Sequence, residues 1–312
     1  MVSGRLIIHP VKRLGRLAAV ALAAGCLFSA GIAEAQQSCK PVYLTLDTGH
    51  MEVAPLMADI LKKHQVKVTF FAANERTKTG DGTLGKDWAP WWKARAAEGH
   101  EFASHTYDHV YWRGDVAGRS DGPPRARPAP SGGSTAHEVA SVGADVNPVS
   151  FRMRPSAGPS EGKDLTWTAK QYCEEVTRSG ARLQEITGKK TLPLFRAPGG
   201  KASPALLAAA KSCGYEHVGW AAAGFLGDEL PSDKFPNDAL LKKALQNIKS
   251  GDILMAHLGI WSRKDPWAPA VLEPLITGLQ SRGFCFKTLR EHPQYKVWID
   301  SHMGAAVATP AK

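Results

Sequence analysis

Cysteine is scarce in this chain of 312 residues, and no apolar run reaches the roughly 20 residues that a helix needs to span a membrane. Charged residues make up 22 % of the chain and hydrophobic residues 43 %. These proportions exclude wholesale disorder, a collagen-like chain and a polytopic membrane protein. The chain does have an excess of basic residues, 39 Lys+Arg against 29 Asp+Glu, for a formal charge of +10. Such a charge indicates a nucleic-acid partner, an acidic envelope polymer or a basic targeting segment.

Residues 1–35 have the pattern of a secretory signal peptide. Four basic residues open it: Arg5, Lys12, Arg13 and Arg16. The apolar, Ala-rich stretch 17–32 follows, and the small residues of Ala33-Glu34-Ala35 offer a cleavage site before Gln36. A lipoprotein cut before Cys26 and an uncleaved anchor are the alternatives. In each case the body of the chain is exported to the periplasm or the extracellular space, and cleavage of the signal leaves no stable membrane span.

Export changes what the basic charge indicates. Without the four basic residues and Glu34 of the signal, the chain carries 35 Lys+Arg against 28 Asp+Glu, a charge of +7. We therefore expect no nucleic-acid partner and favour a surface glycan or an acidic envelope polymer.

The cysteines agree with export. Four remain after the signal: Cys39, Cys173, Cys213 and Cys285. An even number suits an oxidising compartment, and two disulfides would have three possible connectivities. The wide spacing contains no Cys-x-x-Cys pair, so a structural zinc site is not predicted. Four buried thiols are the alternative.

Short β-prone runs alternate with amphipathic segments along the body of the chain. Strands are predicted over 42–46, 66–71, a short stretch before His105, 192–195, 217–220, 253–256 and 284–288. Helices are predicted over 55–64, 88–97, 166–186, 203–213, 238–248 and 269–280. This order predicts an α/β fold with a mostly parallel sheet, either open or closed into a barrel.

One stretch interrupts the alternation. Residues 119–163 are rich in Pro, Gly, Ser and Ala and have no helical period, so they are interpreted as an insertion with a short hairpin around 149–153. The predicted organisation is one domain over 36–303 that carries this insertion, followed by a flexible tail over 304–312.

Polar residues that follow the predicted strands are the candidates for chemistry, because active residues of parallel sheets gather at the carboxyl ends of the strands. These residues are Asp47, His105, His109, Arg196 and His257. Asp47 could be a general base or a turn residue, and Arg196 could pair with a carboxylate or sit in a plain Pro-Gly turn. The two histidines, four apart, could lie on one helical face and hold one metal ion, or could simply be solvated. His257 could be a general acid or a structural residue.

The order of these fragments resembles the NodB-type polysaccharide deacetylases, a metal-dependent carbohydrate esterase family. The matching fragments are Thr45-Leu46-Asp47-Thr48-Gly49, His105-Thr106-x-x-His109, Arg196-Ala197-Pro198-Gly199-Gly200, a loose Trp220…Asp228 and Met255-Ala256-His257. Supporting matches are Val68-Thr69-Phe70-Phe71 and Gly99-His100-Glu101. The resemblance covers about 42–290 and implies a distorted, incomplete (β/α) barrel of about seven parallel strands.

The resemblance also implies roles for the matching residues. Asp47 corresponds to the base that activates water, and Arg196 to the residue that orients it. His105 and His109 correspond to two ligands of a divalent ion, zinc or cobalt. Gly199 stands where the family offers a backbone N–H to the oxyanion, and His257 corresponds to the acid that protonates the leaving amine.

Two departures from the family pattern bear on activity. The second Asp of the first motif, a metal ligand in the family, is Thr48 here. Either Thr48 or His50 is a candidate to complete the metal site. The family's aromatic residue in the third motif is Gly199, which keeps the N–H and loses a wall of the groove.

These observations leave three functional hypotheses. The first is metal-dependent N-deacetylation of an N-acetylated sugar polymer or oligomer. The second is a degenerate family member that binds glycan without hydrolysis, and the third is an amidohydrolase that acts on a different C–N bond. Trp261 and Trp267 could stack on sugar rings or belong to the core.

Overall fold

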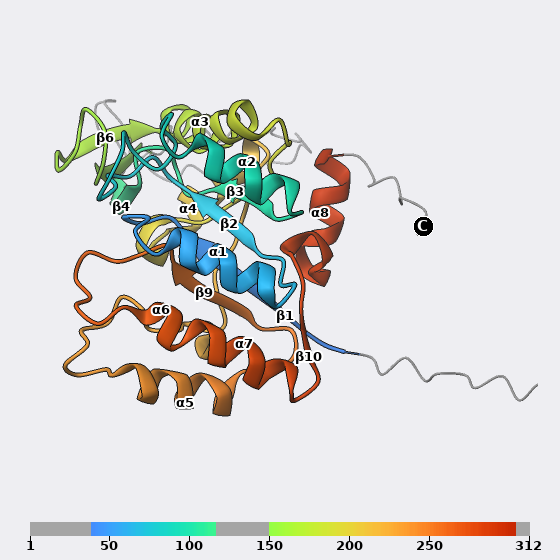
Figure 1. Ribbon diagram of the computed structural model, residues 1–312. Helices are drawn as coiled ribbons and strands as arrows, with labels where there is room; N and C mark the ends of the chain where they lie inside the picture. Colours follow the sequence, from blue (N-terminus) through green and yellow to red (C-terminus); the bar gives the residue numbers. More distant parts are fainter. Residues whose placement is uncertain (1–38, 117–149, 304–312) are drawn as a thin grey trace, which may run out of the picture. The chain divides into compact units, whose positions relative to one another are not determined.

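The computed structural model describes residues 39–116 and 150–303, and its main feature is a seven-stranded parallel sheet in the order β10-β1-β2-β3-β7-β8, with β9 also paired to β1 (Figure 1). Its strands are β1 (Lys40–Asp47), β2 (Thr69–Ala72), β3 (Glu101–Ser104), β7 (Leu194–Phe195), β8 (Glu216–His217), β9 (Ile253–His257) and β10 (Phe284–Phe286). From Val42 onward β1 is buried, as expected for a parallel strand covered on both faces.

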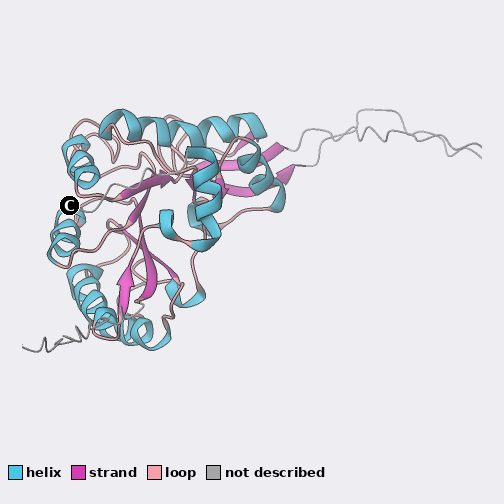
Figure 2. Cartoon of the chain, turned by 90° about the vertical axis from the view of Figure 1, so that its right-hand side faces the viewer, coloured by secondary structure: helices cyan, strands magenta, loops and turns pink. Residues whose placement is uncertain are grey.

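Helices surround the parallel strands on the outside (Figure 2). They are α1 (Ala54–Lys63), α2 (Ala89–Ala97), α3 (Ala169–Thr187), α4 (Pro204–Ser212), α5 (Asn237–Asn247), α6 (Trp267–Ala270), α7 (Leu272–Gln280) and α8 (Pro293–Met303). Helix α4 begins where the sequence predicts, because the Ser203 side chain accepts a hydrogen bond from the Leu206 N–H at 3.1 Å and Pro204 fits the first turn. No helix in these described residues is long and apolar enough to cross a membrane.

The ring of strands is incomplete between β8 and β9. There the segment 218–226 makes scattered hydrogen bonds to β7 and β9. The Val218 N–H donates to the Phe195 carbonyl at 2.8 Å, the Ala221 N–H to the Ile253 carbonyl at 3.0 Å and the Leu226 N–H to the Met255 carbonyl at 3.3 Å. A single bridge joins Phe225 to Met255. The predicted fold class, a distorted and incomplete barrel of parallel strands, is confirmed.

A second, antiparallel sheet of three strands was not predicted. It consists of β4 (Val110–Val116), β5 (Ser150–Pro155) and β6 (Leu165–Thr168). β5 lies at the position of the predicted hairpin and is the central strand. The helix predicted from residue 166 begins at Ala169 instead, because 165–168 pair with β5 and Thr168 forms a capping box with Gln171. Helix α8 was not predicted either.

Several sequence predictions fall on residues outside the described ranges. They are the signal peptide at 1–35 with its alternatives, most of the insertion (117–149) and the tail at 304–312. The domain boundaries therefore remain predictions.

The four remaining cysteines form two disulfides rather than four thiols. Cys39, just before β1, is bonded to Cys285 in β10, and Cys173 in α3 is bonded to Cys213 at the end of α4. Cross-links of this kind stabilise a fold mainly by restricting the unfolded chain.

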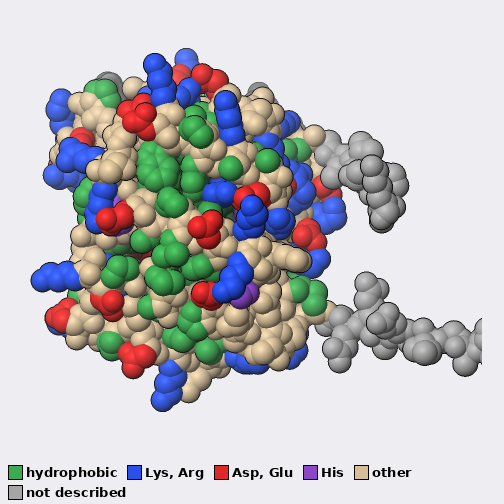
Figure 3. All heavy atoms as spheres, viewed as in Figure 1, with side chains coloured by type: hydrophobic (Ala, Val, Ile, Leu, Met, Phe, Trp, Pro, Cys, Tyr) green, Lys and Arg blue, Asp and Glu red, His purple; other side chains and the backbone are tan. Residues whose placement is uncertain are grey.

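Charge is not concentrated on the face shown in Figure 3. Lys and Arg side chains are spread over it and interspersed with Asp and Glu. This face therefore offers no extended basic patch to a polyanion.

Candidate active site

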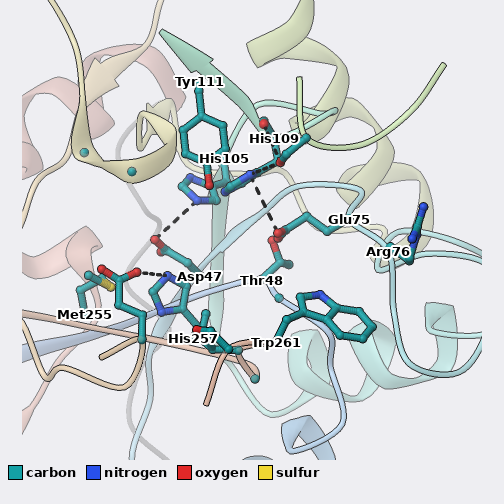
Figure 4. A pocket seen from close by; sticks show the side chains of 18 of the residues that line it. Asp47, Thr48, Glu75, Arg76, His105, His109, Tyr111, Met255, His257 and Trp261 are labelled. Carbon is teal, nitrogen blue, oxygen red and sulfur yellow. Dashed lines mark hydrogen bonds and ion pairs between the residues drawn. The ribbon is translucent and has the colours of Figure 1, made fainter. Parts of the chain in front are cut away.

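A pocket of about 520 Å³ opens at the carboxyl ends of the parallel strands. It is lined from β1 by Asp47, from beyond β2 by Glu75, from beyond β3 by His105 and His109, and from β9 by His257 (Figure 4). Gly199, from the turn η1 (Pro198–Gly200) beyond β7, also lines it. Of the five predicted strand-end residues, Asp47, His105, His109 and His257 thus lie around one cavity, as the parallel topology requires. Arg196 contacts Asp47 but does not line the cavity.

Asp47 is the last residue of β1 and is almost fully buried. Its Oδ1 accepts a hydrogen bond of 2.6 Å from Nη1 of Arg196. Arg196 is itself completely buried, and its remaining donors reach the carbonyls of Val218 and Gly219, both at 3.2 Å. The guanidinium is therefore held from several sides and fixes one oxygen of Asp47, while the other lies 3.6 Å from Nε2 of His105.

The histidine pair does not lie on a helix. His105 and His109 occupy the turn between β3 and β4, in which Thr106 (φ +58°) and His109 (φ +47°) have left-handed backbone conformations. The two rings still meet, with centroids 4.8 Å apart. Left-handed non-glycine residues cost about 1–3 kcal/mol each and persist where the surroundings demand them. The turn, rather than helical spacing, is what brings the two rings together.

The hydrogen-bond partners assign the proton of both histidines to Nδ1. Nδ1 of His105 lies 2.9 Å from the carbonyl oxygen of Arg196, which can only accept. The Ser156 hydroxyl donates to the carbonyl of His109 at 3.1 Å and therefore accepts from Nδ1 of His109 at 2.6 Å. Nε2 of each ring is thus left with a lone pair. Burial, and secondly the neighbouring His109, hold the pKa of His105 well below its usual value, so His105 is neutral.

His257, the last residue of β9, is held by Asp228. Oδ2 of Asp228 accepts the backbone N–H of His257 at 2.6 Å, and both carboxylate oxygens lie 3.1 Å from its Nδ1. Burial lowers the pKa of His257, but Asp228 first and then Asp47 and Glu229 outweigh it and raise this pKa to about 9. His257 is therefore protonated at neutral pH, as a proton donor must be.

The two candidates for completing the metal site lie in different places. Thr48 lines the main pocket, where its hydroxyl accepts a hydrogen bond from the Ala73 N–H at 3.0 Å. His50 lines a separate pocket of about 110 Å³; its Nδ1 accepts the Glu52 N–H at 3.2 Å and its ring packs edge-on against Trp261. The structure does not bring His50 to the histidine pair.

The missing aromatic wall at Gly199 is supplied by another element. Gly199 has φ +65°, and a Cβ atom added there would lie 3.0 Å from Tyr111 of β4. The Tyr111 ring also packs against His109, with centroids 4.9 Å apart. Sequence reasoning missed Tyr111 because it did not predict β4.

The two tryptophans that follow β9 have different environments. Trp267 is buried in the core, whereas Trp261 is 58 % exposed and lines the main pocket. Sequence reasoning also missed Glu75, which lies three residues beyond the end of β2, and that place shortly after a strand was its only signal.

The donors around the histidine pair have the chemistry that a divalent ion requires. Two imidazole nitrogens with free lone pairs and a nearby carboxylate suit zinc or cobalt. Among residues 39–116 and 150–303, no three His, Cys, Asp or Glu side chains already converge as a metal cluster. The fit is therefore one of donor type: suitable nitrogen and oxygen atoms lie near one another but do not converge on one point.

Comparison with known proteins identifies this fold as that of the carbohydrate deacetylases and esterases. A family 4 acetyl xylan esterase from Clostridium thermocellum, solved with a cobalt ion, matches with a TM-score of 0.53 at 19 % identity over 83 % of this chain and 91 % of its own. A Bacillus anthracis protein described as a pseudoenzyme of that esterase family matches with a TM-score of 0.51 at 17 % identity over 82 % of this chain and 66 % of its own.

The sequence comparisons are more specific. The family model for polysaccharide deacetylase matches residues 34–218, so the chain belongs to the polysaccharide deacetylase family. The peptidoglycan-N-acetylmuramic acid deacetylase PdaA of Bacillus subtilis is 26 % identical over 255 residues, which are 80 % of this chain and 70 % of that protein. The peptidoglycan-N-acetylglucosamine deacetylase of Bacillus cereus is 24 % identical over 261 residues, 82 % of this chain and 90 % of that protein.

Proposed function

We propose that the chain is an exported, metal-dependent hydrolase that removes acetyl groups from an N-acetylated sugar polymer or oligomer. The observation that carries this proposal is the pairing of two opposed groups in one pocket: Asp47 held by Arg196, and protonated His257 held by Asp228. The relatives named for peptidoglycan and chitooligosaccharide deacetylation support a glycan substrate.

Each of these residues has its own role in the hydrolysis of an acetamide. Asp47 takes a proton from water as the water oxygen bonds to the acetyl carbon. The carbonyl oxygen, now negative, faces the backbone N–H of Gly199. As the C–N bond breaks, His257 gives its proton to the nitrogen, and acetate and a free amine leave. Arg196 keeps the Asp47 carboxylate turned toward the water.

His105 and His109 would hold the divalent ion, zinc or cobalt, through their Nε2 atoms. When bound, such an ion polarises the acetyl carbonyl and lowers the pKa of water. The hydrogen bonds from Nδ1 of each ring fix its orientation and make Nε2 a better ligand.

The rim of the pocket suits a sugar chain. Trp261 presents an exposed ring at one side, and Tyr111 forms a wall at the other (Figure 4). Sugar faces stack on aromatic rings of this kind.

Export is supported by the two disulfides, because such bonds persist in oxidising compartments. Peptidoglycan, on which two of the relatives act by name, lies outside the cell membrane.

The test is acetate release from N-acetylglucosamine oligomers and from peptidoglycan by purified wild type, Asp47→Asn and His257→Gln. Loss of a general base or acid typically costs about 10²–10⁴-fold, so we expect kcat to fall by that amount in each variant. His64→Gln, whose side chain pairs with Glu273 away from the pocket, is the matched control and should keep wild-type activity. Wild-type rates in both pocket variants would contradict the proposed roles.

A second function is favoured by Thr48, a neutral residue at the position where the resemblance to the family implies an acidic metal ligand. A chain unable to hold the ion would bind glycan without hydrolysing it. Turnover by the wild type excludes this reading, whereas glycan binding without release of acetate supports it. Release from N-formyl or imide substrates alone would indicate the remaining alternative, an amidohydrolase of a different C–N bond.

A further inference from the structure

Glu75 is a half-buried carboxylate at the edge of the histidine pair, and neither the sequence motifs nor the proposed reaction uses it. Its Oε1 lies 4.0 Å from Nδ1 of His109, and its side chain is 19 % exposed. Its Oε2 is buried and has no hydrogen-bond partner among the described residues. Figure 4 shows the carboxylate beside Thr48, turned toward the two imidazole rings.

The nearby basic side chains pair with other acids. Arg76, the next residue, lies 3.4 Å from Glu161, and Lys78 pairs with Glu52. Burying a carboxylate oxygen without a hydrogen-bond donor or a cation beside it costs free energy. The orphaned oxygen of Glu75 therefore indicates a cationic partner that belongs in this corner of the pocket.

The backbone around Glu75 is fastened to the histidine turn. The Asn74 N–H donates to the carbonyl of Tyr107, which lies between the two histidines, at 2.6 Å. The Glu75 N–H donates to Thr83 Oγ1, and the Thr83 N–H donates back to the Glu75 carbonyl, both at 3.0 Å. The backbone of Glu75 is thus fixed beside His105 and His109 by the fold.

Thr48 belongs to the same arrangement. Its hydroxyl accepts the N–H of Ala73, two residues before Glu75, and so ties the end of β1 to the start of the loop that carries the carboxylate. The residue that replaces the family's acidic ligand positions the segment that brings another acid to the pocket.

We propose that Glu75 supplies the carboxylate that completes a divalent metal site with His105 and His109, so that the negative ligand has moved from the end of β1 to the loop after β2. This inference rests on the metal dependence in the proposed function. Because the three side chains do not converge in the described structure, the Glu75 side chain would have to turn toward the histidine pair to join the ion. Two neutral imidazoles and one carboxylate form a ligand set known for zinc.

The test measures Zn²⁺ affinity by calorimetry and the visible absorption of bound Co²⁺ on chelator-stripped protein. The variants are wild type, Glu75→Gln, Glu161→Gln and the double variant Thr48→Asp/Glu75→Gln. Glu161→Gln removes a carboxylate from the rim of the same pocket and controls for the change in charge. Since partners outside the coordination shell typically contribute about 10- to 100-fold, we expect Glu75→Gln to weaken Zn²⁺ binding about 100-fold or more.

Further results separate this inference from its alternatives. Glu161→Gln should bind as wild type does, and Thr48→Asp should restore affinity and the Co²⁺ spectrum to Glu75→Gln. Zn²⁺ should raise the Tm of wild type and have little effect on that of Glu75→Gln, while equal metal-free Tm values show that both fold. Unchanged Zn²⁺ affinity in Glu75→Gln, or no metal binding by wild type, overturns the inference.

The inference and the proposed function can fail separately. Glu75-dependent metal binding without acetate release from any glycan would leave the metal site standing and refute the deacetylase. Metal-dependent acetate release that is insensitive to Glu75→Gln would support the deacetylase and refute the role of Glu75 in the metal site.

Discussion

The proposed proton-donor role of His257 depends on Asp228, and Asp228→Asn tests that dependence directly. The substitution keeps the size of the side chain and removes its charge. The Asp228 carboxylate is the largest of the influences that raise the pKa of His257, against the burial that lowers it. Without the Asp228 charge, the effect of burial is less fully offset, so the pKa of His257 falls from about 9 toward or below its ordinary value of 6.5.

The size of the expected effect follows from the difference between the two pKa values of His257. One pKa unit corresponds to about 1.4 kcal/mol, so holding the imidazolium at a pKa of about 9 rather than 6.5 amounts to about 3 kcal/mol of preference for the charged form. The donor works only when protonated, so activity is present below the pKa of His257 and is lost as pH rises through it. Wild type should therefore keep its activity to about pH 9, whereas Asp228→Asn should begin to lose it near neutrality.

The assay is the dependence of kcat/KM on pH for acetate release, measured from pH 6 to pH 11. Asp233→Asn, a substitution of an exposed Asp in the same region, is the control and should keep the wild-type profile. An alkaline limb at the same pH in wild type and Asp228→Asn would refute the assignment of that limb to His257.

Four further substitutions concern the pocket and its surroundings. Arg196→Lys keeps the charge but loses the planar guanidinium that reaches Asp47, Val218 and Gly219. We expect kcat to fall about 10²-fold, because small misplacements of reacting groups have effects of that size. A wild-type kcat would contradict this. Gly199→Ala places a Cβ against Tyr111 at φ +65°, and a cost of about 1–2 kcal/mol should appear as a lower Tm in calorimetry, while an unchanged Tm would show that the turn relaxes freely. Trp261→Ala should raise KM for long oligomers and change the free energy of unfolding by less than about 0.5 kcal/mol, because the side chain is exposed. Trp267→Ala should instead destabilise the protein by about 3–5 kcal/mol in denaturant titrations, since Trp267 is buried, and the reverse pattern would exchange the roles of the two residues.

The parallel strands could be predicted because each is a short, continuous apolar run, the pattern of strands buried on both faces. β4 could not, because its sequence, Val-Tyr-Trp-Arg-Gly-Asp-Val, mixes polar and apolar residues and contains Gly114 at an irregularity in its pairing with β5. Its partner strand also begins more than 30 residues later. The start of α3 was misplaced because 165–168 continue its apolar pattern while they pair as a strand.

The residues of the candidate site likewise fall into those that the sequence predicts and those that it does not. Asp47, Arg196 and His257 follow strands that the sequence predicts, and parallel topology then brings them to one edge. Glu75 and Tyr111 reach the pocket through a loop fastened to Thr83 and through an unpredicted strand, so their proximity depends on long-range contacts. His50 follows Thr48 by only two residues, yet it lies on the other side of the turn, against Trp261.

The most direct test of the central claim is acetate release from N-acetylglucosamine oligomers by the chelator-stripped protein before and after Zn²⁺ or Co²⁺ is returned. The account predicts no release without metal and turnover once it is restored. Binding of the oligomers without any metal-dependent release would contradict the claim and leave a glycan-binding member of the polysaccharide deacetylase family.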